Sequence, residues 1–181
     1  MTLADLTSEE RETLLRRCWY GHDACWFRSV AEKLGLEAAN DLNRRALRLQ
    51  GRREARELVR TLGLPGARGL GDVLAFFDVA AHLLAPVPLM EFWLEVVDEC
   101  TYDVRLERCF VHESIVRAGL ADAYVCAVFD RIYGWHEGLN LPLTEEPEGL
   151  PCARAAGREC QRRLCLRSAS GDAADRGPAP G

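Results

Sequence analysis

Hydrophobic and polar positions follow a helical period through the first half of the chain. Thr7 is followed three residues later by Glu10, the pattern of a capping box, so we expect a helix from here that ends at Gly35. Residues 36–62 predict one or two further helices, with Gly51 as the break if there are two.

The pattern changes after a Gly/Pro-rich hinge and a strongly apolar helix over residues 70–84. Residues 91–97 and 102–109 are rich in β-branched and aromatic side chains, and the second run alternates apolar with polar positions. Together they predict a β-hairpin. A short helix, a longer helix and a second hairpin are then predicted over residues 111–118, 121–137 and 152–168. The longer helix is expected to end at Gly138.

This order, helices first and then mixed strands and helices, is typical of an α+β fold. We expect a helical N-terminal half packed on a small antiparallel sheet with helices. The predicted parts are N-terminal helices (1–65), a cysteine-rich α+β core (66–168) and a disordered tail (169–181). At this length they would form one compact domain with a tail.

The composition is that of a soluble globular protein, and the charge bears on which kinds of binding partner are expected. The net charge of −5 argues against nucleic acid as the main partner. The N-terminus lacks the pattern of a secretory signal, and charges and prolines interrupt the most apolar run, so we expect no membrane span and a cytoplasmic location. In that reducing compartment, eight cysteines indicate metal binding, catalysis or burial rather than a disulfide framework.

Four cysteines in the second half have the spacing of a metal site: Cys109, Cys126, Cys152 and Cys160. A turn at Gly157 would place Cys152 and Cys160 directly opposite each other in the second hairpin, with Cβ atoms about 4.5–5.5 Å apart. Two thiolates that bind one zinc ion at about 2.3 Å suit this separation. Cys126 would approach from the longer helix. An iron–sulfur cluster could use the same thiolates, but the chain lacks a Cys-x2-Cys run, which favours zinc. The alternative is that the cysteines are ordinary core side chains.

The spacing Cys126-x25-Cys152-x7-Cys160, with a small-residue and glycine turn, resembles the 4-vinyl reductase domain. The resemblance covers residues 90–167 and implies an α+β core related to transport-particle subunits of the Bet3 type. In the sensor members it implies a structural zinc, held by three cysteines and a glutamate, beside a buried ligand pocket. Gly149 stands where the family has the glutamate. The candidates for the fourth ligand are Cys109, which we prefer, His112 and Glu148.

A second resemblance covers more of the chain. The segments "WYGHDACWF", "RCFVHESIVRAGLADAYVC" and "GLPCARAAGREC" resemble the L-2-amino-thiazoline-4-carboxylic acid hydrolase-like family. The residues that fit its Trp-Tyr-x-His-Asp-x-x-Trp signature are Trp19, Tyr20, His22, Asp23 and Trp26. The resemblance implies hydrolytic opening of a small sulfur-containing ring.

The stretch "CWYGHDACWF" lies in the middle of the first predicted helix and is a candidate site. His22 and Asp23 are the candidate catalytic acid and base, because a histidine titrates near neutral pH and indole rings would desolvate the carboxylate. The residues expected to line the ligand pocket are Trp19, Tyr20, Trp26, Asp78 and His82. The alternative for both His–Asp pairs is a hydrogen-bonded structural role. A separate metal site at Cys18, His22 and Cys25, which share a helix face, is less favoured.

Two functions fit these residues. The first is a metal-binding protein that hydrolyses small sulfur-containing cyclic compounds. The second is a non-catalytic small-molecule-binding module, as in a sensor, with a structural zinc. The expected partner is a small-molecule ligand or substrate, and the apolar, Arg-rich helices would suit a homodimer. The Arg-rich stretch 44–60, interleaved with glutamates, predicts a solvated or salt-bridged surface, with an anionic ligand or nucleic acid as the lesser alternative.

Overall fold

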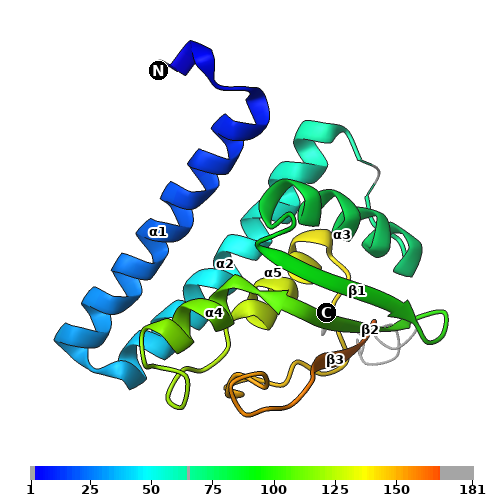
Figure 1. The fold of residues 1–181 in the computed structure, drawn as a ribbon. Helices are drawn as coiled ribbons and strands as arrows, with labels where there is room; N and C mark the ends of the chain where they lie inside the picture. Colours follow the sequence, from blue (N-terminus) through cyan, green and yellow to red (C-terminus); the bar gives the residue numbers. More distant parts are fainter. Residues whose placement is uncertain (1–2, 65, 168–181) are drawn as a thin grey trace, which may run out of the picture.

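The computed structural model describes residues 3–64 and 66–167, and the predicted tail lies outside them. After a short 3-10 turn at Leu3–Asp5, the elements are α1 (Ser8–Leu34), α2 (Leu36–Leu62), α3 (Leu70–Leu84), β1 (Met90–Val96), β2 (Thr101–Cys109), α4 (Phe110–Arg117), α5 (Val128–Leu139) and β3 (Cys160–Cys165). Figure 1 shows the two long helices on one side, with the sheet and the shorter helices beside them. The α+β fold class is confirmed.

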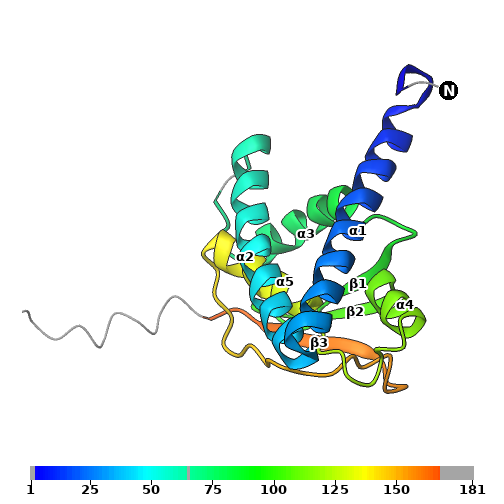
Figure 2. The same cartoon turned by 90° about the vertical axis from the view of Figure 1, so that its left-hand side faces the viewer.

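The first helix begins and ends where the sequence predicts. Thr7 accepts a hydrogen bond from the backbone amide of Glu10, and the Glu10 carboxylate accepts one from the amide of Thr7. Gly35, with φ +90°, ends the helix. Phe27 is the one buried residue of α1, and the N-terminal end of the helix projects past the rest of the molecule (Figures 1 and 2). Its formation therefore owes more to capping than to burial.

The closest packing in the molecule is between α2 and α5, through glycines. A Cβ atom at Gly51 would overlap the carbonyl oxygen of Arg131, and one at Gly134 would overlap that of Arg48. A Cβ at Gly138 would lie 2.6 Å from the Cβ of Ala55. Gly51 therefore allows the two backbones to touch and does not break the helix, because α2 is continuous from Leu36 to Leu62.

The longer helix of the second half starts later and ends later than predicted. Residues 121–127 form a turn and an isolated bridge, in which Val125 pairs with Pro151, and α5 begins only at Val128. Asn140, in the left-handed conformation, ends it in place of Gly138. A glycine in a sequence can mark either a helix end or a close contact. Gly138 marks a close contact with α2, and the helix continues past it.

The sheet has the order β1-β2-β3, with both neighbouring pairs antiparallel. The hairpin predicted from residues 91–109 is confirmed. The second predicted hairpin is wrong. Residues 153–157 form turns, and β3 pairs with β2 instead of folding back on the Cys152 segment.

One face of the sheet is buried against the helices. Tyr102, Val104 and Leu106 of the central strand point into the main core, where Phe77 of α3 and Trp135 of α5 meet them. A smaller core adjoins the main one, and its buried residues are Phe27, Ala39, Ile115, Tyr124 and Cys152. The cysteine-rich segments lie between these two cores.

Candidate functional site

The four cysteines of the predicted metal site come from four separate segments. Cys109 ends β2, and Cys160 begins β3, where it pairs with Leu106. Cys126 lies just before α5, and its amide donates a 2.9 Å hydrogen bond to the carbonyl of Leu150. Cys152 follows two residues after Leu150, so this bridge holds two of the cysteine segments together.

Neighbouring thiols of this group help to raise the pKa values of Cys109, Cys126 and Cys160. Burial, and after it the neighbouring Cys109, Cys160 and Cys152, raise the pKa of Cys126 to about 12. Burial, then Cys109 and Cys152, likewise raise the pKa of Cys160 to about 11. The pKa of Cys109 is also raised, chiefly by burial. In the metal-free chain these three thiols are therefore protonated at neutral pH. We call Cys109, Cys126, Cys152 and Cys160 the thiol cluster.

The arrangement of the thiol cluster differs from the predicted hairpin. Cys152 does not lie opposite Cys160 on a paired strand, because β3 uses its hydrogen bonds on β2. Gly157 has the positive φ expected of the turn residue, but that turn leads into β3 from a coiled segment. Over residues 3–64 and 66–167, no group of three or more His, Cys, Asp or Glu side chains is arranged so that it could hold a metal ion.

The other candidates for the fourth ligand differ in their surroundings. The Nδ1 atom of His112, on α4, lies 3.8 Å from the Sγ atom of Cys152 and so borders the cluster. Glu148 instead accepts hydrogen bonds from Arg44 and Arg48, each at 3.1 Å. The carboxylate of Glu148 is thereby held toward α2.

A partly buried arginine that the sequence analysis missed, Arg154, stands beside the thiols. Arg154 donates a 3.3 Å hydrogen bond from Nη1 to the carbonyl of Leu106, while its buried Nε has no hydrogen-bond partner. Its positive charge lowers the pKa values of Cys109 and Cys160, against the larger effect of burial. A guanidinium with an unused donor next to thiols favours their charged, thiolate forms.

The predicted catalytic pair lies on the surface of α1. The side chain of His22 is 76 % exposed and that of Asp23 is 43 % exposed, with 3.4 Å between Nδ1 and Oδ1. Trp26 is also exposed, and Cys18 and Cys25 lie on the exposed surface of the same helix. The enclosed aromatic pocket expected around His22 and Asp23 is therefore not formed by these side chains. Their part in chemistry stays a prediction.

Trp19 and Tyr20, from the same signature, attach α1 to the body of the protein. Tyr20 donates a hydrogen bond to the carbonyl of Leu84 and packs on the ring of Phe110 with centroids 4.4 Å apart. The guanidinium carbon of Arg131 lies 5.4 Å from the centre of the Trp19 ring. The observed contacts of both aromatic rings are thus structural.

Asp78 and His82 also face solvent, on α3. Their side chains are 75 % and 79 % exposed, and His82 Nδ1 is 2.7 Å from the backbone oxygen of Asp78. The apolar face of α3 carries Phe76 and Phe77 into the core and turns these two polar residues outward. A position in a shared pocket with His22 is not observed.

Two buried polar groups went unnoticed in the sequence because their partners are distant. Arg131 of α5 donates two hydrogen bonds to Glu54 of α2, at 2.9 and 2.6 Å, and Trp135 donates a third at 2.9 Å. Elsewhere, His136 Nε2 lies 2.5 Å from the hydroxyl of Tyr102, and its Nδ1 lies 3.1 Å from the carbonyl of Leu141. Burial lowers the pKa of His136 to about 4, so the ring is neutral at pH 7.

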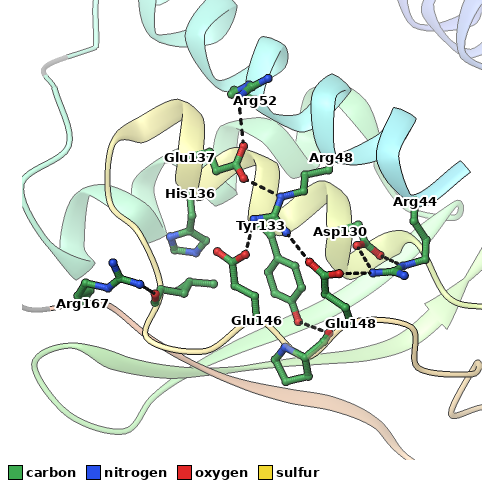
Figure 3. Close-up of polar contacts among 12 residues, drawn as sticks. Arg44, Arg48, Arg52, Asp130, Tyr133, His136, Glu137, Glu146, Glu148 and Arg167 are labelled. Carbon is green, nitrogen blue, oxygen red and sulfur yellow. Dashed lines mark hydrogen bonds and ion pairs between the residues drawn. The ribbon is translucent and has the colours of Figure 1, made fainter. Parts of the chain in front are cut away.

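The Arg-rich stretch of α2 forms the salt-bridged surface that was predicted. Figure 3 shows Arg44 and Arg48 reaching across to acidic side chains from α5 and from the loop that follows it. Arg44 binds both oxygens of Asp130 at 3.2 Å. Arg48 contacts three carboxylates, those of Glu137, Glu146 and Glu148. These arginines reinforce the contact between α2 and α5.

The fold and the thiol cluster define a thiol-rich α+β protein. The chain belongs to the Family of unknown function (DUF6125), whose model matches residues 9–133. That match includes Cys109 and Cys126 and ends before Cys152 and Cys160. The resemblance to the L-2-amino-thiazoline-4-carboxylic acid hydrolase-like family is not confirmed.

Among solved structures, the chain is similar to a trafficking protein particle complex subunit 3 from Naegleria fowleri, solved covalently bound to palmitic acid. The identity is 16%, the alignment covers 89% of this chain and 98% of that chain, and the TM-score is 0.46. A likeness at this level says nothing about what this chain binds. The curated proteins give no significant match.

The described helices were also compared with the requirements of a membrane span. None of them is both long enough and apolar enough to cross a bilayer.

Proposed function

We propose that this protein is a metal-binding α+β module in which the thiol cluster holds a structural zinc ion. The observation that supports the proposal is the gathering of Cys109, Cys126, Cys152 and Cys160 from four chain segments, within electrostatic reach of one another. Cysteine thiolates are the usual ligands of structural zinc, and four protein ligands leave no open position for a substrate. The ion would supply cross-linking of the fold rather than catalysis.

The donor set fits zinc in kind and in number, although the thiols do not yet converge on one point. Binding would require the side chains to turn toward a common centre and to lose their protons. Because the pKa of Cys126 is about 12 and that of Cys160 about 11 before binding, the ion has to displace those protons. Arg154, with its unused Nε donor, would help to hold the thiolates.

His112 is the alternative to Cys109 as fourth ligand, because its ring borders Cys152. Glu148 is a weaker candidate, since its carboxylate is already paired with Arg44 and Arg48. Replacement of Cys109 and of His112 in separate variants would decide between the first two: the true ligand should weaken zinc binding when it is removed.

A non-catalytic module is favoured over a hydrolase by the exposure of His22 and Asp23. An acid–base pair works best where water is excluded, and these two side chains are exposed to solvent. Hydrolysis of thiazoline-type rings therefore stays a prediction from the resemblance alone. The small-molecule partner, the homodimer and the cytoplasmic location also stay predictions.

The test is the zinc content of the full chain, purified without a tag, for wild type, Cys152→Ser and Cys25→Ser. Elemental mass spectrometry should find about one zinc per chain in wild type and in Cys25→Ser, which alters an exposed thiol on α1. Cys152→Ser should lose the zinc and melt at a lower temperature. The apparent affinity for added zinc should rise with pH, because protons leave the thiols on binding.

Two results would overturn the proposal. One is wild-type protein that takes up no zinc even after refolding in its presence. The other is equal zinc retention by Cys152→Ser and wild type. Iron with visible absorbance would replace zinc by an iron–sulfur cluster on the same thiols.

A further inference from the structure

Two further cysteines, Cys100 and Cys165, lie at the end of the sheet opposite to Cys160. Cys100 closes the turn between β1 and β2, and Cys165 is the last residue of β3. Their backbones are fixed relative to each other, because the amide of Leu166 donates a 2.8 Å hydrogen bond to the carbonyl of Cys100. Cys165 is also the strand partner of Thr101, the residue that follows Cys100.

The two sulfur atoms are 3.8 Å apart, in van der Waals contact. Cys100 is exposed and Cys165 is partly exposed, so an oxidant in solution can reach both. We propose that Cys100 and Cys165 form a redox-active dithiol, which closes to a disulfide on reaction with a small-molecule disulfide of the glutathione type. The sulfur atoms would have to approach from 3.8 Å to about 2.05 Å, a movement that rotation of the two side chains can supply.

The polar surroundings shift the pKa values of the two thiols in opposite directions. A hydrogen bond with Thr101, followed by one with Cys100, lowers the pKa of Cys165 below its ordinary value. Cys165 is therefore the better source of thiolate, the form that attacks a disulfide. Thr101 also lowers the pKa of Cys100, but hydrogen bonds to Asp98 and Cys165 outweigh it and the pKa is raised. The Cys100 thiol donates to the Asp98 carboxylate at 3.3 Å, a contact that favours the protonated thiol.

The reaction then has two exchange steps. In the first, the Cys165 thiolate bonds to one sulfur of the small-molecule disulfide, and the other sulfur leaves as a thiolate. In the second, the Cys100 sulfur, after losing its proton, attacks the Cys165 sulfur and releases the second small-molecule thiolate. The protein loses two electrons and two protons in total, and the oxidant takes them up as two thiols.

The bond would join the β1–β2 turn to the end of β3, between residues 65 positions apart in the sequence. It would lock the central and edge strands together where the described chain leaves the sheet. A cross-link over so long a loop restricts the unfolded chain, so the oxidised protein should melt at a higher temperature than the reduced one.

The two exposed cysteines of α1, Cys18 and Cys25, serve as a control for the reactivity of Cys100 and Cys165. Cys18 and Cys25 are equally exposed, but each lies alone on α1 without a sulfur neighbour among the hydrogen-bond partners described. They can take up a glutathione group but cannot resolve it within the chain. The proposal concerns Cys100 and Cys165 only and does not depend on zinc in the thiol cluster.

The test is to incubate the reduced full chain with glutathione disulfide, alkylate the remaining thiols under denaturing conditions and digest with trypsin. Cys100 and Cys165 fall on separate tryptic peptides, residues 69–105 and 164–167, each with a single cysteine. Mass spectrometry should find these two peptides linked in wild type and in the Cys18→Ser/Cys25→Ser double variant. The Cys100→Ser variant should instead accumulate a glutathione adduct on Cys165, while Cys165→Ser should react more slowly at Cys100.

The proposal is overturned if peptides 69–105 and 164–167 stay unlinked when Cys18 and Cys25 are fully modified. It is also overturned if the link appears only after the protein has been unfolded. Circular dichroism of each variant should match wild type, since both substituted positions lie at the surface end of the sheet. A variant that fails this control leaves the wild-type link and the double variant as the deciding measurements.

Discussion

Helices α1 and α2 have the same length, 27 residues each, but the protein uses them differently. Six residues of α2 are buried, among them Gly51, Glu54 and Ala55, whereas Phe27 alone is buried in α1. The two helices differ in burial because they pack against different parts of the protein. Through its small residues α2 receives the backbone of α5, while α1 rests on the body through a few aromatic side chains. A helix can thus be encoded locally and yet contribute little or much to stability.

The largest effect is expected at the buried ion pair between α2 and α5. Glu54→Gln keeps the size of the side chain but leaves the charge of Arg131 without its partner in a site where the arginine side chain is 12 % exposed. Such uncompensated buried charges cost about 3–5 kcal/mol. Urea unfolding should show this loss for Glu54→Gln. The matched change Glu57→Gln, at an exposed pair with Arg60 on the same helix, should have little effect on the free energy of unfolding. Equal losses would mean that α2 and α5 are not held by this pair.

Replacing a glycine by alanine should lower stability where α5 packs on α2 but raise it on the exposed helix α1. Gly134→Ala forces a methyl group against the backbone of α2 and should cost about 3 kcal/mol by overpacking. Gly21→Ala on α1 meets nothing within 4 Å and should add about 0.5–1 kcal/mol, through better helix propensity. Thermal denaturation of the two variants beside wild type measures both. A loss at Gly21 comparable to that at Gly134 would show that α1 is covered by something in solution.

Acid should lower the free energy of unfolding through the buried His136 of α5. Its folded pKa is about 4, below the ordinary 6.5, so the unfolded chain binds a proton that the folded chain excludes. The contribution is complete above pH 6.5 and is lost as the pH falls toward 4, by roughly 3 kcal/mol. The unfolding free energy of His136→Gln should therefore fall less between pH 7 and 4.5 than that of wild type. Parallel pH profiles for the two proteins would contradict the assignment.

The smallest effect is expected at the N-terminus of α1. Thr7→Ala removes the cap and should cost the first turn about 1 kcal/mol. Because this end of α1 projects from the body, the loss should appear as faster hydrogen exchange of the first-turn amides, with little change in the melting temperature. A fall in melting temperature as large as that of Gly134→Ala would place α1 within the cooperative core.

Much of the fold was predictable because its signals are local. The capping box at Thr7, the glycine end at Gly35 and the alternation in β2 each depend on a few neighbouring residues. The first two appear as predicted, and so does the alternation apart from Asp103, which is buried as well. The second hairpin failed because residues 152–165 contain turn and strand signals but no information about which strand they pair with. Strand β3 pairs with β2, and each of its residues lies more than fifty positions from its partner in the sequence.

The candidate site divides in the same way. The spacing of the cysteines in sequence singled out Cys109, Cys126, Cys152 and Cys160, and the structure gathers them in one region between its two cores. The contacts of Arg154, Glu54 and His136 could not be read from the sequence, because each has its deciding partners on another element. For His22 and Asp23, the surrounding aromatics suggested a pocket, but helix periodicity alone does not say which face is covered.

The sequence by itself determined the long helix α1 and the β1–β2 hairpin, because caps, periodicity and alternation act over a few residues. Only the tertiary structure decided that Gly51 and Gly134 are contacts rather than breaks, that Trp19 and Tyr20 fasten α1 to the body, and that His22 faces water. It also decided that Cys100 meets Cys165. Burial, pKa and reactivity depend on which distant segments pack together, and that is a property of the whole folded chain.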